Sequence, residues 1–485
     1  MSASFVNLLP MAIVAFGAMV CIATEPFVAD KNKQKVLPWV ASAFLVLSAI
    51  SFVFVKVDAA PLFGFFEMGA LRVVLSLAVL LCAFLGIGGL QVTLAREKYP
   101  AGEPYGLALL ATVGVLIMVQ SVDFIPLFVG MELAAYPIYG LVGLRRKDRN
   151  ANEATFKYFV TGAVFSVVFL YGMSLIYGAT GTTHFGGKVL AGRELLYSAG
   201  VLLSSFALLF KAGAAPIHFW VADVYSGASV AVTGFMAAVV KVGALAALGA
   251  LWMRSGVEKL APVMIVVAIL SIVIGSLSGI AQKSIRRIIA FSAVMNAGFM
   301  VLGLVSKDLS AMYYFLVTYA LGSAGALAAI SAFSGKNDEK ENLDDIRGQG
   351  RRRPLEGIAA VVCLASLAGL PPLSGFLAKF VLFSGVVSSG FVALAAFGFV
   401  FSIVAIYYYL RVAISIFAPA EKTDDAKNEN ALSSSTYFLL RLGVTVTSIA
   451  LVCLALMPIL FSCEDILRHC HCEGIGFTRL CNLLQ

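Results

Sequence analysis

The chain has 485 residues, of which 60% are hydrophobic and only 13% are charged, and its formal net charge is +8 at pH 7. Soluble globular proteins are about 45–50% apolar and about 25% charged, so this composition excludes an ordinary soluble domain. Apolar runs of about 18 or more residues recur along the whole chain, which is typical of transmembrane helices and not of a β-barrel. The sequence therefore predicts an all-α polytopic membrane protein.

Fourteen membrane spans are predicted, with short connections between them. The first span is expected to be retained and not cleaved as a signal peptide, because no Lys or Arg precedes it. The predicted spans are 5–23, 37–55, 70–95, 105–121, 124–144, 155–178, 199–220, 228–252, 260–281, 287–306, 311–334, 355–386, 390–417 and 436–462.

The distribution of Lys and Arg predicts the orientation of these spans. Connections after odd-numbered spans carry 23 basic residues, connections after even-numbered spans and the C-terminal tail carry nine, and three lie inside spans. Because basic residues are enriched in cytoplasmic loops, both termini are expected outside the cytoplasm. The same bias explains the net positive charge, so no nucleic-acid partner is expected.

Four ionisable side chains lie inside apolar spans, namely Glu132, Lys211, Lys241 and Lys379. An unpaired charge at the centre of a bilayer costs about 2.5–3.5 kcal/mol on insertion scales, and such residues usually mark a functional pathway. Each could instead extend its charge to the membrane interface, an explanation that fits Lys241 least well. Because a buried lysine loses its proton more readily and a nearby carboxylate opposes this loss, the four residues are predicted to form a proton relay.

Two spans are predicted to be broken by proline. Lys211 stands five residues before Pro216 in KAGAAPIHFW, and Ser366 stands five residues before Pro371 in SLAGLPPLSGFLAKF. Irregular backbone at membrane depth is tolerated where it lines a polar cavity, and matching breaks in two halves favour an inverted-repeat transporter. On a straight helix His218 would share a face with Lys211, so it is a candidate relay member, with a structural role equally expected.

The breaks also predict how the chain is organised. Residues 1–104 would contain three N-terminal spans, and residues 418–462 would contain the last span. Between them, residues 105–252 and 260–417 would form two inverted five-helix repeats, spans 4–8 and spans 9–13, each with one proline-broken helix.

The remaining residues, 463–485, form a tail that contains Cys463, Cys470, Cys472 and Cys481, with His469 and His471. A metal site or a disulfide would be the functional interpretation, and an unselected extension is the simpler one. The spacing fits common zinc sites poorly, so oxidation is the better of the two functional options.

Several segments resemble the antiporter-like membrane subunits of NADH:quinone oxidoreductase, the respiratory complex I. The resemblance is carried by LFKAGAAPIHFWVADVYSGASVAVTGF, ATFKYFVTGAVFS and SLAGLPPLSGFLAKFVLFSG, and it covers about residues 70–417. YGATGT and DVYSGA favour the subunit N members of that family.

The resemblance implies a role for each charged residue. Glu132 matches the fifth-helix glutamate that modulates Lys211 of the broken seventh helix, and Lys241 matches the central lysine of the eighth helix. Lys379 matches the twelfth-helix lysine of the exit half-channel, where subunit M usually carries glutamate. Many relatives have histidine where this chain has Asn296, so a proton path through that point would need water.

The resemblance further implies a proton-translocating subunit with no cofactor or metal of its own. Other subunits of the parent complex would bind NADH, FMN, iron–sulfur clusters and quinone. The expected partners are the lipid bilayer, subunit M and small membrane subunits, in a bacterial inner membrane with both termini periplasmic. Two alternatives remain: a subunit of a cation/proton (Na⁺/H⁺) antiporter or membrane-bound hydrogenase complex, and a scaffold that no longer pumps, which the four charges disfavour.

Overall fold

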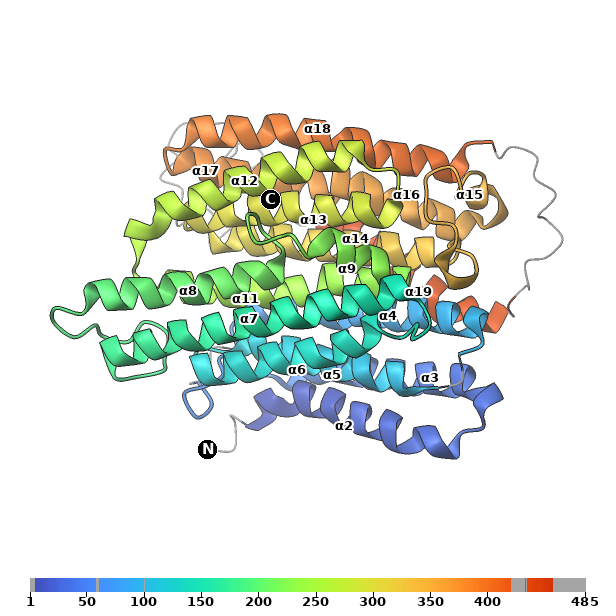
Figure 1. Ribbon diagram of the computed structural model, residues 1–485, viewed down its shortest axis with the longest axis horizontal. Coiled ribbons are helices and arrows are strands. Elements are labelled where there is room, and N and C mark those ends of the chain that lie inside the picture. The colour runs from blue at the N-terminus through green and yellow to red at the C-terminus, as the bar shows by residue number, and fades with distance from the viewer. Residues whose placement is uncertain (1–4, 58–60, 100, 420–431, 433, 457–485) are drawn as a thin grey trace, which may run out of the picture.

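The computed structural model describes residues 5–57, 61–99, 101–419, 432 and 434–456 as a bundle of long helices that lie side by side (Figure 1). Within these residues the only β-type pairings are isolated bridges. The predicted all-α fold is thus confirmed, and the Cys/His tail lies outside the described residues.

Thirteen helices of the described chain are long and apolar enough to cross a membrane. One of them, Val230–Ser255, is a composite of α10 (Val230–Phe235), a π-helical turn η4 (Met236–Val240) and α11 (Lys241–Ser255). The others are α2 (Leu9–Thr24), α3 (Asp30–Ser51), α4 (Ala70–Glu97), α5 (Glu103–Gln120), α6 (Phe124–Val142), α7 (Arg149–Thr180), α8 (Glu194–Ala212), α12 (Ala261–Ala281), α13 (Ile285–Val305), α14 (Leu309–Ser331), α18 (Val392–Phe417) and α19 (Phe438–Leu456).

The predicted span 355–386 is present as two shorter apolar helices, α16 (Pro354–Ala368) and α17 (Ser374–Ser388). Counted together as one broken span, they complete the fourteen predicted spans. Two short helices lie at the connections. α9 (Val221–Gly227) follows the break after α8, and α15 (Gln349–Arg352) precedes α16.

Both breaks begin with the same local structure. The residue that follows α8 is Gly213, with φ of 73°, and the residue that follows α16 is Gly369, with φ of 82°. A left-handed residue ends a helix without steric cost only when it is glycine, which explains why each break begins at this residue type. If the two repeats are aligned at these glycines, Lys211 corresponds to Leu367. If they are aligned at the prolines, as the sequence spacing suggests, Lys211 corresponds to Ser366, one residue earlier.

A close contact between two helices recurs in the two repeats. A Cβ atom at Gly114 of α5 would lie 2.6 Å from the Gly130 carbonyl oxygen and closer still to the Ala134 amide of α6. A Cβ atom at Gly275 of α12 would lie 2.7 Å from the Phe291 oxygen and closer still to the Met295 amide of α13. An offset of 161 residues maps the first contact onto the second, and it also maps the start of α6 onto the start of α13. Such contacts between small residues are a common way for membrane helices to pack.

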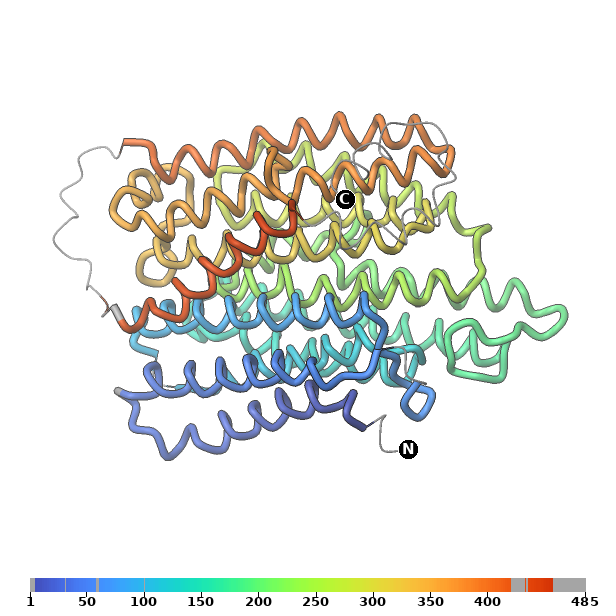
Figure 2. The backbone as a smooth tube through the Cα atoms, turned by 180° about the vertical axis from the view of Figure 1, so that it is seen from behind, coloured from blue at the N-terminus to red at the C-terminus, as the bar shows by residue number. Residues whose placement is uncertain are grey.

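The repeats run in opposite directions because each contains five spans and the chain reverses at every connection (Figure 1). The last helix, α19, crosses the back of the bundle diagonally (Figure 2). Its Leu440 backbone packs on Gly88 of α4, and its Arg441 Nε donates a 2.8 Å hydrogen bond to Glu356 of α16. α19 therefore joins the N-terminal spans to the second repeat.

Candidate proton-relay site

Lys211 lies in the last turn of α8, directly before the break. The break leaves few polar backbone groups without partners, because Trp220 Nε1 donates to the Phe210 oxygen at 3.1 Å and the Ala215 amide donates to Ser271 Oγ at 2.8 Å. A cation at this position also interacts favourably with the C-terminal end of the helix dipole. The sequence thus places a buried lysine in the last turn of α8, at the carbonyl end of that helix.

The surroundings of Lys211 on α6 are polar but not paired with it. Its Nζ is 3.5 Å from the Tyr139 hydroxyl, at the outer limit of a hydrogen bond, and 5.8 Å from the centre of the Tyr139 ring. Glu132, seven residues earlier on α6, is half-buried and accepts a 2.5 Å hydrogen bond from Ser166 Oγ of α7. In the described part of the chain, no carboxylate forms an ion pair with Lys211, so any influence of Glu132 acts through space.

A small cavity, with room for about one water molecule, adjoins Lys211. The buried Tyr158 hydroxyl on its wall has no hydrogen-bond partner among the described residues. The cavity reaches Val240, the residue before Lys241. Its lining residues are Met118, Met131, Ala134, Ala135, Tyr158, Lys211 and Val240.

Lys241 follows the π-helical turn η4, which the hydrophobic pattern of the sequence does not predict. π-Helical turns are rare and occur frequently at functional sites. The Lys241 Nζ donates a 2.5 Å hydrogen bond to the Ala293 carbonyl oxygen of α13 and lies 5.2 Å from the centre of the Tyr319 ring. The 161-residue offset maps Glu132 onto Ala293, so the second repeat offers a backbone carbonyl where the first repeat has a carboxylate.

A hydroxyl–amide cluster lies next to that carbonyl. Ser292 Oγ and the Tyr409 hydroxyl of α18 are in direct contact. Asn296 Nδ2 donates to the Tyr409 hydroxyl at 3.1 Å and to the backbone carbonyl oxygen of Ser292 at 2.8 Å. Asn296, which stands where many relatives are expected to have histidine, therefore belongs to a polar network with Ser292 and Tyr409. Sequence reasoning missed Tyr409, although a tyrosine within the apolar run of α18 was a usable signal.

Lys379 lies on α17, on the far side of the second break from α16. Its Nζ donates to the carbonyl oxygens of Leu367 and Ala368, both at 3.0 Å, at the C-terminal end of α16. These carbonyls have no partner within α16, because the helix ends at Gly369. Lys379 thus reaches back across the break, whereas Lys211 precedes its own break.

His218 lies in the irregular segment between α8 and α9 and is half-buried. Because α8 ends at Ala212, the straight-helix spacing that paired His218 with Lys211 does not apply. Its Nδ1 is buried without a hydrogen-bond partner among the described residues. The structure therefore brings Lys211 close to Tyr139 and Tyr158, and it does not bring His218 into contact with Lys211.

Comparisons with known proteins bear on this arrangement. A family model described as NADH:quinone oxidoreductase/Mrp antiporter, TM, matches residues 121–406. NADH-quinone oxidoreductase subunit N of Cupriavidus taiwanensis is 35% identical over 486 residues, which cover 93% of this chain and 96% of that protein. Subunit N of Trichlorobacter lovleyi is 35% identical over 366 residues, which cover 72% of this chain and 75% of that protein.

Solved structures show the same fold. A chain of respiratory complex I from Thermus thermophilus with bound aureothin is 29% identical, with a TM-score of 0.78 over 93% of this chain and 98% of that chain. A chain of the Mrp complex from Dietzia reaches a TM-score of 0.80 over 94% of this chain and 95% of that chain, at 23% identity, which supports the fold alone. The sequence resemblance is confirmed: the chain belongs to the NADH:quinone oxidoreductase/Mrp antiporter family of transmembrane subunits, among the members named subunit N.

Proposed function

We propose that this chain is the proton-translocating subunit N of an NADH:quinone oxidoreductase, with Glu132, Lys211, Lys241 and Lys379 as its relay and His218 as an accessory group. One observation carries the proposal. The three lysines are only 4%, 2% and 6% exposed, lie within the membrane-spanning bundle, and have only uncharged contact partners among the described residues.

The uncharged partners matter because a tightly paired lysine keeps its proton. Removing one partner from a buried ion pair strands the other charge and typically costs 3–5 kcal/mol, which opposes proton loss from such a pair. A carbonyl or hydroxyl partner accepts a hydrogen bond from either –NH₃⁺ or –NH₂, so the amine can change its charge without losing its contact. Contacts of this kind suit groups that must gain and release protons.

The proposed path follows the polar groups in order. A proton would pass from Lys211 through the small cavity beside Tyr158 to Lys241, and then through the Ser292–Asn296–Tyr409 cluster to Lys379. Glu132 would shift the proton affinity of Lys211 through space as its own charge or distance changes. In this scheme the cluster at Asn296 conducts through hydroxyl groups and water and needs no histidine.

The remaining assignments follow from the family. Electron transfer from NADH through FMN and iron–sulfur clusters to quinone would take place on other subunits and drive this chain from outside. Subunit M and small membrane subunits would be its neighbours. The chain would lie in the inner membrane of a bacterium with both termini periplasmic, as the Lys and Arg distribution favours.

Co-purification tests this assignment directly. We expect a tagged chain, extracted gently from native membranes, to bring down flavin, iron–sulfur signals and NADH:quinone activity. Recovery of the chain with other membrane subunits alone would contradict the complex I assignment. Na⁺/H⁺ exchange in vesicles would then support the antiporter alternative.

Replacing Tyr409 by phenylalanine tests the hydroxyl cluster. The change keeps the ring but removes the oxygen that contacts Ser292 and Asn296, so we expect proton-coupled turnover to fall about tenfold, equivalent to about 1.4 kcal/mol. The measurement is NADH-driven proton uptake by membrane vesicles. Tyr407→Phe is the matched control, because the Tyr407 side chain, two residues earlier on α18, is exposed. Equal proton uptake by the two variants would remove Tyr409 from the path.

A further inference from the structure

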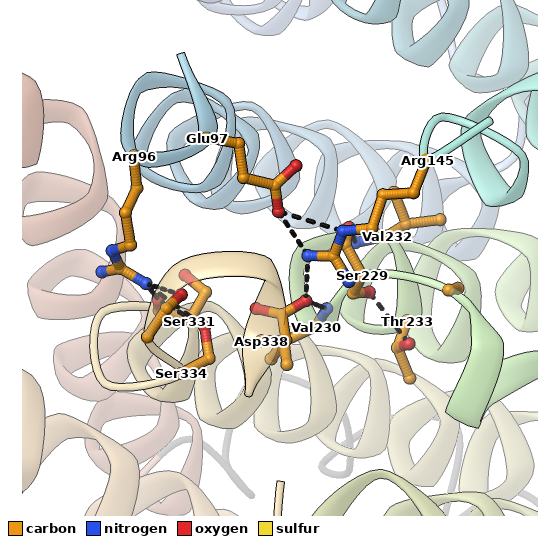
Figure 3. Close-up of polar contacts among 12 residues, drawn as sticks. Arg96, Glu97, Arg145, Ser229, Val230, Val232, Thr233, Ser331, Ser334 and Asp338 are labelled. Carbon is orange, nitrogen blue, oxygen red and sulfur yellow. Dashed lines mark hydrogen bonds and ion pairs between the residues drawn. The ribbon is translucent and has the colours of Figure 1, made fainter. Parts of the chain in front are cut away.

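The connection between α14 and α15, residues 332–348, docks onto the first repeat at the junction between α9 and α10 (Figure 3). Its start is held by Arg96 of α4, which donates to the carbonyl oxygens of Ser331, Ala332 and Gly335 at 3.0–3.1 Å. Two acids further along, Asp338 and Glu341, then contact the first repeat directly or through an arginine. Neither acid belongs to the proposed relay.

Asp338 holds the amide side of the junction. Its Oδ2 accepts a 3.0 Å hydrogen bond from the Val230 amide, the first residue of α10, and lies 2.7 Å from Arg145 Nη2 (Figure 3). Arg145 also donates to Glu97 at the end of α4, with its Nε at 3.0 Å. A carboxylate beside a helix N-terminus is favoured by the dipole, so Asp338 caps α10 from a distant part of the chain.

Glu341 holds the carbonyl side of the junction through Arg286. The Arg286 Nη1 donates to the Ala228 carbonyl oxygen at 2.6 Å, and its Nη2 lies 3.1 Å from Glu341 Oε2. Ser284 Oγ fixes the other carboxylate oxygen of Glu341 at 2.6 Å. The two acids therefore grip Ala228 and Val230, the residues on either side of Ser229, the N-cap residue of α10.

The backbone is strained at the point where Asp338 contacts the junction. Asn337 and Asp338 both have positive φ, 55° and 53°, a conformation that is strained for residues with a side chain. Burial alone would lower the pKa of Arg145, but the charges of Asp338 and Glu97, with their hydrogen bonds, outweigh burial and raise it above its ordinary value. Arg145 thus remains a cation between two carboxylates, and the contact is held by full charges.

We propose that Asp338 and Glu341 are positioning residues that clamp the α9–α10 junction and so fix the helix that carries Lys241 relative to the break beside Lys211. The functional part of this inference rests on the proposed proton relay. The clamp links the second repeat to the segment of the first repeat that lies between Lys211 and Lys241. Its loss would let α10 shift and change the distance over which the proton moves.

Hydrogen–deuterium exchange on the intact, detergent-extracted assembly tests the clamp itself. In Asp338→Ala we expect amides 230–235 to exchange at least tenfold faster than in the unmodified protein, and in Glu341→Ala at least severalfold faster. Asp344→Ala is the control, because Asp344 is exposed and its ion-pair partner among the described residues is the nearby Arg347. Asp338→Ala leaves Arg145 paired with Glu97, so no buried cation is stranded and the variant should fold.

Function provides a separate readout. We expect Asp338→Ala to lower the number of protons moved per NADH oxidised while quinone reduction in detergent stays normal, and Asp338→Glu to restore part of the loss. Unchanged exchange at 230–235 in both alanine variants would overturn the clamp, whatever the assembly pumps. Exchange at 230–235 could be faster in the variants even though the unmodified assembly moves no protons. That result would support the clamp and would contradict only the proposed function.

Discussion

Replacing Lys241 by methionine is expected to stop coupled proton translocation almost completely, by more than about tenfold. Methionine has a similar length and fits an apolar core, but it has no proton to exchange. The Ala293 carbonyl would lose its donor, at a cost of about 1–3 kcal/mol, while removal of a buried charge offsets part of that cost. We therefore expect the variant to assemble and insert normally.

The measurement is NADH-driven proton uptake in membrane vesicles, compared with the amount of assembled complex in the same membranes. Lys188→Ala is the control, because Lys188 is exposed in the connection between α7 and α8. If Lys241→Met pumped at the normal rate, the central step of the relay would be wrong. If the variant failed to assemble, Lys241 would have a structural role that the proposal does not include.

A second large effect is expected from Gly275→Leu. The backbone of α13 lies where the new side chain would begin, and a backbone cannot move aside as a flexible side chain can. Overpacking in a core costs about 1–3 kcal/mol when side chains yield, so a clash with backbone should cost more. Because folded proteins are stable by only about 5–15 kcal/mol, we expect little assembled protein to remain.

Fluorescence-detected size exclusion of a tagged chain would measure this loss. Gly178→Leu is the matched control, because a Cβ atom there would meet only Leu196 at an ordinary 3.7 Å. The repeat offset adds a further expectation, namely that Gly114→Leu behaves like Gly275→Leu. A normal elution profile for either variant would show that the helix pairs can separate without loss of the fold.

Much of the fold could be predicted from local chemistry. Apolar length located the spans, because each must satisfy its own backbone hydrogen bonds in lipid. Proline and glycine located both breaks, and isolated lysines in apolar runs marked the buried amines. Counting from Gly213 and Gly369, the residues that follow the two broken helices, shifts the register between the repeats by one residue from the register that the proline spacing predicts.

The parts that could not be predicted depend on contacts between distant segments. The π-helical turn before Lys241 has no signature in the apolar pattern of the chain. Glu356 lies in the first turn of α16, and its burial against Arg441 of α19, 85 residues away, depends on a contact that the sequence does not show. Glu132 lies midway along α6, and its side chain is only half-buried in the described chain. Asp338 lies in the most polar connection, where a sequence gives no reason to choose one acid over its neighbours.

The diagonal course of α19 constrains how the protein can move. Many transporters with inverted repeats work by rocking one repeat against the other around a fixed site, the motion known as alternating access. Here α19 packs against α4 through Gly88 and is bonded to α16 through Arg441 and Glu356. A movement of the second repeat against the N-terminal spans would have to break these contacts. α19 thus ties the N-terminal spans to the second repeat, and in the proposed relay protons would travel by the reorientation of side chains and water while these helices stay in place.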